Sequence, residues 1–435
     1  MMTGMVVEDA RKAVTALLRM VESRRQLGKA IRLMQRRGAL PDDLYEIAVY
    51  FADNRVNLYQ IRQWYAPLAA LAQRHPVVVI ARSPDGAVAL AEECPLPVQF
   101  LQTAEDLETF VARQRLRLVF YVNQNIRNFQ MLWFGRLLHV FVSHGESDKS
   151  YMSSGQIGAY DYALVGGQAA LDRLDATLWN YDVAARAIPI GRPQIDHSRA
   201  AASPLPSDGR IAVLYAPTCE GDRPSMRYGS VASHGEALVS ALLGDPRFRL
   251  IYRAHPRTGT VDPGYRAAHA RIVAAIAAAN AADPAAQHVH DDGPEVGWQL
   301  AHADVAILDV SAMVYDRLAF GGPLLVTRPV DARAEIDRRG YLAECEWLDA
   351  ADAAGVAELI PRMAADEAAA ARLARWSEHY FGDTAPGAAT SRFQDAVERL
   401  LGEWSRRRQA TEPATDRGAA TASAEAADDD LAALA

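Results

Sequence analysis

Short apolar runs that alternate with helical stretches are the strongest constraint on how this sequence can fold. Between residues 75 and 199 each run is rich in Val, Ile, Leu and aromatic residues and is followed by a polar or helical segment. Short buried strands separated by helices are typical of a parallel sheet, because parallel strands need crossover connections. The strands predicted in this first series are residues 77–80, 98–101, 116–122, 138–142, 160–165 and 187–190.

A second series of the same kind follows a break in composition. Residues 200–208 combine small residues with two prolines, which is typical of a linker. The strands predicted beyond it are residues 211–215, 248–252, 288–290, 305–308 and 324–326. We therefore predict an α/β fold class with two doubly wound, Rossmann-like domains, residues 75–199 and 209–405, whose loops face a common cleft.

The two ends of the chain differ from this pattern. Residues 1–74 are predicted to form an N-terminal helical segment, in which residues 7–37 place apolar residues near helical spacing between many basic ones. This helix could lie on anionic lipid, or pack on its own domain with a solvated charged face, and the sequence leaves both alternatives open. Residues 407–435 are dominated by Ala, Thr, Asp and Glu, which predicts a disordered tail.

Charge and cysteine content limit the partners and the compartment. The formal net charge of -8 argues against a general nucleic-acid-binding surface, so an anionic ligand needs a local group of positive charges and backbone donors. Cys94, Cys219 and Cys345 lie far apart and fit no zinc-ligand spacing, which indicates a reducing compartment. No segment approaches the roughly 20 apolar residues of a membrane-spanning helix. We expect a cytoplasmic protein, with peripheral attachment to the inner face of the membrane through the N-terminal helix left open.

A loop at residues 144–149 holds the first group of candidate catalytic residues. It follows the predicted strand 138–142, and open α/β sheets bind ligands at the carboxyl ends of their strands. The imidazole of His144 can accept a proton near neutral pH, and Gly145 lets a substrate approach the backbone. Glu146 or Asp148 could orient the imidazole, and Lys149 could attract a phosphate. We predict that His144 is catalytic.

The second domain holds candidate phosphate-binding residues at three strand ends. Arg253 and His255 follow the strand 248–252 and lie two residues apart, so both could reach one diphosphate. Ser311 ends the strand 305–308 and is placed to cap the following helix, whose free N–H groups favour phosphate. We predict a diphosphate site here, although capping alone would also explain Ser311.

Further candidates have less specific signals. Thr218 follows the first strand of the second domain and could bind a phosphate or close a turn. Asp309 and Asp316 are placed with the donor-binding residues, and Asp316 could instead fix Arg317. Arg192 ends the strand 187–190 and is placed with Gly145 and Lys149 on the acceptor or phosphate side. We expect no metal site, because the histidines and aspartates of residues 288–292 lack a third ligand at a telling spacing.

These motifs recur in the order of a known family. His144-Gly with Lys149, Tyr160-Asp-Tyr, Gly191-Arg-Pro, Tyr215-Ala-Pro-Thr, Arg253-Ala-His-Pro and the run of residues 303–311 resemble the CDP-glycerol glycerophosphotransferases of teichoic acid synthesis. The resemblance implies a GT-B fold, a cytidine diphosphate donor bound in the second domain, and peripheral membrane attachment. It also matches His144 to the general base, His255 to the histidine at the donor diphosphate, and Ser311 to the first serine of an Asp-x-Ser-Ser run.

The reaction implied by the resemblance is the transfer of a polyol phosphate, in particular glycerol phosphate, from a CDP-activated donor. The acceptor would be a hydroxyl of a cell-envelope glycan or a lipid-linked acceptor, and no cofactor would be required. Two alternatives stay open: a GT-B glycosyltransferase that uses a nucleotide-diphosphate sugar, and a non-catalytic relative. Ala312 and Glu220 depart from the family pattern and favour the second alternative.

Overall fold

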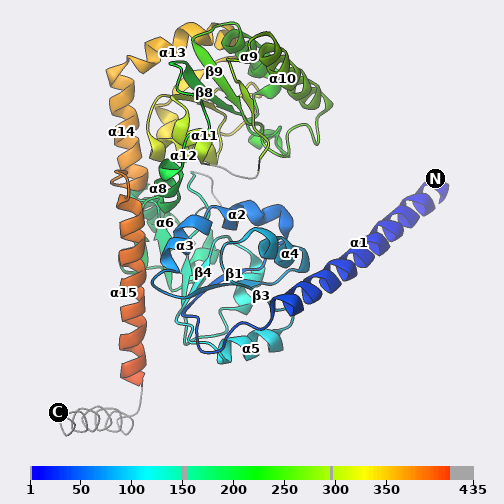
Figure 1. Ribbon diagram of the computed structural model, residues 1–435, viewed down its shortest axis with the longest axis vertical. Helices are drawn as coiled ribbons and strands as arrows, with labels where there is room; N and C mark the ends of the chain where they lie inside the picture. Colours follow the sequence, from blue (N-terminus) through cyan, green and yellow to red (C-terminus); the bar gives the residue numbers. More distant parts are fainter. Residues whose placement is uncertain (1, 148–151, 153, 294–296, 412–435) are drawn as a thin grey trace.

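Two parallel sheets, one in each half of the chain, form the framework of the protein. The computed structural model describes residues 2–147, 152, 154–293 and 297–411. The first sheet has the strand order β3-β2-β1-β4-β5-β6-β7 and the second β10-β9-β8-β11-β12-β13, with parallel pairing throughout both. Each sheet carries helices on both faces and forms its own domain (Figure 1). This confirms the predicted α/β class with two doubly wound domains.

The strands are short and almost entirely buried, as expected for a parallel sheet covered on both sides. The strands of the first sheet are β1 (Ile47–Phe51), β2 (Val77–Ala81), β3 (Val98–Phe100), β4 (Leu118–Tyr121), β5 (Leu138–Phe141), β6 (Tyr162–Val165) and β7 (Ala187–Pro189). The strands of the second sheet are β8 (Ile211–Ala216), β9 (Phe248–Tyr252), β10 (Val289–His290), β11 (Val305–Leu308), β12 (Leu324–Thr327) and β13 (Glu346–Leu348).

Helices connect the strands on both faces. Those of the first half are α1 (Met2–Arg37), η1 (Arg55–Asn57), α2 (Leu58–Arg62), α3 (Tyr65–Leu71), α4 (Pro84–Glu93), α5 (Ala104–Ala112), η2 (Ile126–Gln130), η4 (Gly155–Ala159), α6 (Gln168–Thr177), α7 (Val183–Arg186) and α8 (Pro193–Ala200). Those of the second half are η5 (Pro224–Met226), η6 (Val231–Gly235), α9 (Glu236–Leu243), α10 (Pro263–Ala282), α11 (Trp298–His302), α12 (Ala312–Phe320), η7 (Tyr341–Ala343), η8 (Ala350–Gly355), α13 (Val356–Ala364), α14 (Glu367–Phe381) and α15 (Ala388–Thr411).

Strand β1 corrects the prediction that residues 1–74 are helical. It lies between β2 and β4 in the first sheet, and all five of its side chains are buried. Both faces of a central parallel strand are covered, so its sequence, Ile-Ala-Val-Tyr-Phe, is a continuous apolar run. A run of this kind has no period that separates a strand from a buried helix. Strand β13 was also not predicted, and it extends the edge of the second sheet beside β12.

Helix α15 brings the end of the chain back to the first domain. Its residues Phe393, Val397, Leu400 and Leu401 are buried in the same core as β1, β2 and β4. Phe393 packs against Trp64, with ring centroids 5.3 Å apart. Figure 1 shows α14 and α15 running along one side of both domains. The last part of the predicted 209–405 domain therefore covers the first sheet, not the second.

Helix α15 also corrects the start of the predicted tail. Residues 407–411 are helical, with Arg407 bonded to Glu403 one turn earlier at 2.8 Å and to the hydroxyl of Tyr162 at 3.2 Å. These contacts of Arg407, to the preceding turn of α15 and to Tyr162 of the first domain, extend the helix beyond the end of its apolar pattern. The rest of the predicted tail, residues 412–435, lies outside the described residues.

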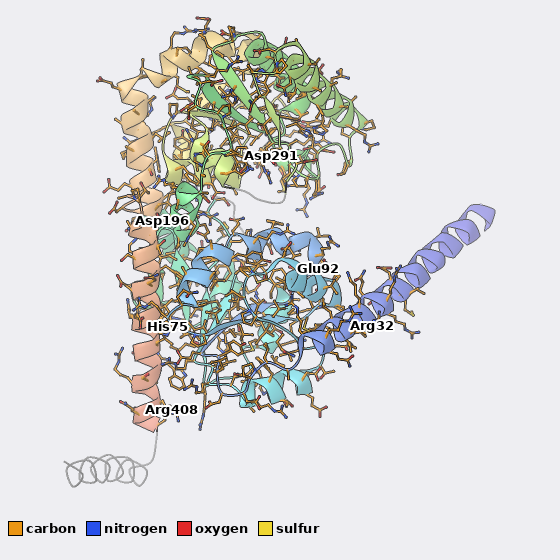
Figure 2. All side chains as sticks on the ribbon, in the orientation of Figure 1. Arg32, His75, Glu92, Asp196, Asp291 and Arg408 are labelled. Atoms are coloured by element: carbon orange, nitrogen blue, oxygen red, sulfur yellow. The ribbon has the colours of Figure 1, made fainter. Side chains whose placement is uncertain are left out.

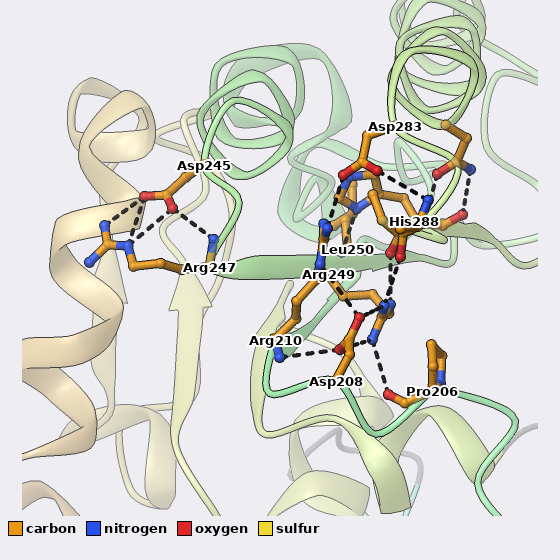
Figure 3. A network of polar contacts seen from close by, with 12 residues as sticks. Pro206, Asp208, Arg210, Asp245, Arg247, Arg249, Leu250, Asp283 and His288 are labelled. Carbon is orange, nitrogen blue, oxygen red and sulfur yellow. Dashed lines mark hydrogen bonds and ion pairs between the residues drawn. The ribbon is translucent and has the colours of Figure 1, made fainter.

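The linker is fixed to the second domain by a buried arginine. Arg249, on β9, is 1% exposed and forms a two-pronged ion pair with Asp208 at 2.6 and 3.0 Å (Figure 3). This guanidinium lowers the pKa of Asp208 to about 2. Arg249 also donates to the carbonyl oxygens of Pro206 and Ala286. The residues just before β8 are therefore held at the amino end of the second sheet, away from the strand ends that form the candidate site.

The C-terminal half of helix α1 packs on the first domain. Ala30 is buried in the first core, and Lys29 pairs with Glu92 of α4 at 3.0 Å. Figure 2 shows Arg32 and Glu92 where α1 meets α4, and Figure 1 shows the rest of α1 extending away from the domain. Within the described part of the chain, no helix is both long enough and apolar enough to cross a membrane.

The contact of α15 with the first sheet gives a first prediction. Replacing Phe393 by Ala removes a ring that fills the core beside Trp64, and such a truncation costs about 3–5 kcal/mol. Amide hydrogen exchange should accelerate in β1 and β4 and stay unchanged in β8 and β9. Arg399→Ala, an exposed site on the same helix, is the control and should leave both sheets unchanged. Faster exchange in β8 and β9 would contradict the assignment of α15 to the first domain.

Candidate active site

The loop that holds His144 leaves β5 through a constrained turn. Ser143 has a φ of 55°, in the left-handed region that a residue with a side chain rarely adopts, at a cost of about 1 kcal/mol or more. Its carbonyl oxygen accepts a hydrogen bond from the indole N–H of Trp64, a buried residue of the first core. The turn is therefore held from the domain interior, and it places His144 just beyond the carboxyl end of β5, as predicted from the sequence.

The His144 ring is fixed in one tautomer. Its Nδ1 lies 3.1 Å from the carbonyl oxygen of Val122, and a carbonyl only accepts, so Nδ1 carries the hydrogen and Nε2 has the lone pair. Burial lowers the pKa of His144 to about 4, the bond to Val122 partly opposes this, and the charge of Arg192 adds to the lowering. The imidazole is therefore neutral at pH 7. Tyr59 stands edge-on to the ring, with centroids 5.8 Å apart.

Of the two acids that the sequence suggested for orienting the imidazole, only Glu146 lies within the described residues, and it contacts other groups. Glu146 is buried, and its carboxylate binds Arg173 and the backbone N–H of Ser147. The group that orients His144 is the backbone carbonyl of Val122, for which a sequence gives no signal. Asp148 and Lys149 lie outside the described residues.

Arg192 connects the His144 loop to the second domain. Its guanidinium donates to the carbonyl oxygen of His144 at 3.1 Å and to the side chain of Gln63 at 2.7 Å. It also pairs with the carboxylate of Asp316, on α12, at 2.8 Å. Arg192 is 8% exposed. Both terminal nitrogens of Arg192 are thus engaged by protein groups, so it positions the loop, whereas the sequence placed it on a substrate. Gly145 lies beside it, and a Cβ there would come within 3.9 Å of the guanidinium.

Asp316 and Arg317 have separate partners. Asp316 faces Arg192, and burial raises the pKa of its carboxyl, although the guanidinium acts in the opposite direction. Arg317 instead donates to the carbonyl oxygens of Leu300 and Ala303, at 2.9 and 3.0 Å. The suggestion that Asp316 fixes Arg317 is therefore wrong, because the side chains of neighbouring helical residues point in different directions.

Asp309 organises the strand ends of the second sheet. Its carboxylate accepts hydrogen bonds from the backbone N–H groups of Thr218 and Ser230, at 2.7 and 3.0 Å, and from the hydroxyl of Thr327 at 2.5 Å. The side chain is fully buried, and burial raises the pKa of Asp309 to about 6. Asp309 therefore supports the loops beyond β8, β11 and β12 from within, whereas the sequence grouped it with donor-binding residues.

The two basic residues beyond β9 differ in their surroundings. Arg253 is engaged by the carboxylate of Asp291 and by the carbonyl oxygen of Gly293, whereas the sequence predicted that it reaches a diphosphate together with His255. The sequence could not show that Asp291, beyond the neighbouring strand β10, would take the guanidinium. His255 is exposed, and its Nδ1 accepts from the backbone N–H of Arg257 at 3.1 Å. The hydrogen of a neutral His255 ring is then on Nε2, which makes that atom a donor.

Ser311 precedes α12 but does not cap it. Its backbone is extended, and its buried hydroxyl oxygen has no hydrogen-bond partner within the described residues. The simple explanation of Ser311 as a capping residue is therefore wrong. A hydroxyl at the N-terminus of a nine-residue helix, together with the N–H groups at the start of its first turn, forms a set of donors suited to a phosphate.

Glu220 has a structural explanation. Its buried carboxylate accepts hydrogen bonds from the backbone N–H groups of Gly259, Val261 and Asp262, at 2.9 to 3.0 Å. Burial raises the pKa of Glu220, but these hydrogen bonds outweigh it and the net shift is downward. The acid that departs from the family pattern is thus directed at the loop before α10. The lowered pKa keeps this carboxylate ionised at neutral pH, with its hydrogen-bond donors in the backbone of the same domain.

The lowered pKa of His144 gives a second prediction. The unfolded chain takes up a proton near pH 6.5, whereas folded His144 does so only near pH 4, so His144 makes the fold less stable as the pH falls between these values. The loss amounts to at most about 3 kcal/mol. Urea unfolding of wild type and His144→Gln at pH 7 to 4 should show a steeper loss for wild type. His379→Gln, on α14, is the control, and parallel curves for wild type and His144→Gln would contradict the buried neutral imidazole.

Solved structures share this two-domain arrangement at low sequence identity. No protein-family model and no curated protein sequence matches the chain. The wall teichoic acid polymerase TagF superposes with a TM-score of 0.54 and 13% identity, over 91% of this chain and 98% of the TagF chain. A TagF variant soaked with CDPG gives the same TM-score at 12% identity, with the same coverage.

Two further solved structures are similar to a comparable extent. A structure described as a UDP-N-acetylglucosamine 2-epimerase from Listeria monocytogenes superposes with a TM-score of 0.55 and 14% identity, over 83% of this chain and 97% of its own. The structure of MnaA from S. aureus with UDP superposes with a TM-score of 0.53 and 12% sequence identity, over 82% of this chain and 97% of the MnaA chain. These likenesses establish the fold: the chain is a two-domain α/β protein with the GT-B fold.

Proposed function

We propose that this chain is a transferase that moves a polyol phosphate, in particular glycerol phosphate, from a CDP-activated donor to a hydroxyl of a cell-envelope glycan or a lipid-linked acceptor. The observation that carries the proposal is the state of His144, a neutral imidazole with Nδ1 fixed on a carbonyl and Nε2 carrying the lone pair. A general base needs this state. The fold shared with TagF, whose structure has been determined after soaking with CDPG, adds support.

The reaction is an in-line displacement at phosphorus. Nε2 of His144 accepts the proton of the acceptor hydroxyl while the hydroxyl oxygen forms a bond to the phosphorus that bears the polyol. The bond from that phosphorus to the bridging oxygen breaks, and the nucleotide leaves as its monophosphate. The two substrates are held in one cleft, so most of the rate gain comes from positioning and from charge stabilisation.

Donor groups of the second domain would stabilise the charge on the leaving phosphate. In the proposal, the Nε2 hydrogen of His255, the Ser311 hydroxyl and the first N–H groups of α12 bind the diphosphate. Thr218, whose backbone is held by Asp309, lines the same strand ends. Asp309 holds the backbone of Thr218, and Arg192 joins the His144 loop to Asp316 of α12. Arg253 is paired with Asp291 and supports the loop beyond β10. The proposed chemistry requires no metal or cofactor, because these protein groups supply the hydrogen-bond donors.

A transfer assay tests the role of His144. With CDP-glycerol and a lipid-linked sugar as substrates, His144→Ala should lower kcat by about 10²–10⁴, the usual contribution of a general base. His255→Ala should lower it by about 10²–10³ while leaving the fold intact, because it removes one donor from a preorganised site. His379→Ala, on α14, is the matched control and should retain wild-type turnover.

The same assay separates the alternatives. Equal turnover by wild type and His144→Ala would refute the base. Turnover of a UDP-sugar in place of CDP-glycerol would favour a glycosyltransferase that uses the same cleft, with attack at carbon. Failure to bind any nucleotide in a thermal-shift screen of CDP-glycerol, CDP-ribitol and UDP-sugars would favour the non-catalytic alternative.

The proposal places the enzyme in the cytoplasm, with α1 resting on the anionic inner face of the membrane. Beyond its contact with α4, α1 exposes Met20, Val21 and Ile31 together with a series of basic side chains. An exposed helix that combines apolar and basic residues binds anionic lipid through both. The basic residues with described, exposed side chains are Arg24, Arg25, Lys29, Arg32, Arg36 and Arg37.

Vesicle sedimentation tests this attachment. Replacing both Arg24 and Arg25 by Glu should reduce binding to phosphatidylserine vesicles at least tenfold, because each basic residue near such a surface contributes about 1 kcal/mol. Arg113→Glu with Arg115→Glu, a pair at the end of α5, is the matched control and should bind like wild type. Unchanged binding by the Arg24 and Arg25 variant, or equal binding to neutral phosphatidylcholine vesicles, would refute the lipid role of α1.

A further inference from the structure

Tyr59 is an exposed aromatic side chain beside the proposed base. It lies on α2, and 48% of its surface is open to solvent. Its ring stands edge-on to that of His144, with centroids 5.8 Å apart and an angle of 85° between the planes. A hydroxyl hydrogen-bonded to Nε2 of His144 lies about 4 Å from the centre of the imidazole, and so no more than about 10 Å from that of the Tyr59 ring. The group that carries this hydroxyl can therefore reach Tyr59.

The segment just after β4 holds both rings. The carbonyl oxygen of Val122 accepts a hydrogen bond from Nδ1 of His144 at 3.1 Å. The next residue, Asn123, donates its side-chain amide to Oε1 of Gln60 at 2.7 Å, and Nε2 of Gln60 donates to the hydroxyl of Tyr59 at 3.3 Å. Two consecutive residues therefore fix the base and the phenol relative to each other. An exposed ring that is already held in place loses little conformational entropy when a ligand binds to it.

Asp53 anchors the helical turn that leads into Tyr59. Its carboxylate accepts hydrogen bonds from the side-chain amides of Asn57, Asn123 and Asn125, at 2.9 to 3.1 Å. The loops beyond β1 and β4 are thus joined next to the phenol, and the half-buried Asn57 and Asn125 bring amide groups to its surroundings. Val56 is 81% exposed and precedes Tyr59 by three residues, which places both side chains on one side of the helical turn. An apolar strip with amides beside it results.

We propose that Tyr59 is the platform on which a sugar ring of the acceptor stacks, and that it selects a cyclic sugar over an open-chain polyol. A pyranose presents a face of C–H groups that packs on an aromatic ring, while the hydroxyls at its edge bond to amides such as that of Asn57. The end of a glycerol phosphate chain has no such face. This inference rests on the proposed function, because the stacked ring carries the hydroxyl that His144 deprotonates. The preferred transfer is then to the sugar end of a glycan, and extension of a polyol phosphate chain is slower.

Direct binding tests the platform without a donor. Saturation-transfer NMR on the full chain with methyl glucoside and methyl N-acetylglucosaminide should give ring-proton signals from at least one of them. Tyr59→Phe keeps the aromatic face and should keep the signals, whereas Tyr59→Leu keeps only apolar bulk and should abolish them. Trp179→Leu, at a 96% exposed site between α6 and α7, is the matched control and should bind like wild type. No glycoside signal in wild type, or equal signals in wild type and Tyr59→Leu, would overturn the platform.

Acceptor kinetics separates selection from a purely structural role of Tyr59. With CDP-glycerol as donor, kcat/KM is compared between an acceptor that ends in a sugar and one that ends in glycerol phosphate. The ratio of the two values should fall about tenfold in Tyr59→Leu, because an aromatic contact of this kind contributes up to about that factor. If Tyr59 only positioned His144, both acceptors would lose activity equally, and an unchanged ratio would overturn the platform while retaining the reaction. Loss of the glycoside signals in Tyr59→Leu of a protein that turns over no CDP-donor would retain the platform and refute the proposed reaction.

Discussion

The guanidinium of Arg192 is the contact on which the relation between the two domains depends. A buried cation is tolerated only with a partner, and here the partner, Asp316, belongs to the other domain. The same guanidinium donates to the backbone carbonyl of His144 and to Gln63. The position of the proposed base is therefore coupled to the position of α12, whose N-terminus is the proposed phosphate site. Lysine could not replace this arginine, because one ammonium cannot present the same planar set of donors.

Asp309 connects loops within the second domain, as Arg192 connects the two domains. Three loops leave the sheet at β8, β11 and β12, and its carboxylate holds the first by the backbone of Thr218 and the last by the hydroxyl of Thr327. Glu220 holds the loop before α10 in the same manner. Both carboxylates thus have their hydrogen-bond donors within the protein. Because backbone N–H groups donate to both carboxylates and a hydroxyl donates to Asp309, the loops at these strand ends are held in place from within the domain.

The sequence predicts most of the fold, because strands are marked by local runs of apolar residues. It predicts the candidate site only in part, because the side chains that pair there are distant in the sequence. Strand positions follow from short apolar runs, and the His144 loop follows from the rule that ligands bind at strand ends. Strand β1 was not predicted, because a strand that is buried on both faces lacks the alternation of apolar and polar residues that marks a half-buried strand. Arg192 and its partner Gln63 are 129 residues apart in the sequence, and Arg253 and its partner Asp291 are 38 residues apart. Residue type shows that an arginine needs an anion, but only the three-dimensional fold decides between a substrate and a neighbouring carboxylate.

The pKa of His144 sets a condition on the proposed mechanism. An imidazole with a pKa near 4 is always available to accept a proton at pH 7, yet it is a weak base, and efficient proton transfer calls for a pKa nearer the working pH. The two causes of the low value are burial and the charge of Arg192, and both act in the absence of substrate. In the proposed mechanism a donor diphosphate would bring negative charge that favours the imidazolium, so donor binding would raise the pKa of His144. His144 would then become a stronger base only when a donor is present, which would link proton abstraction from the acceptor to occupancy of the second domain.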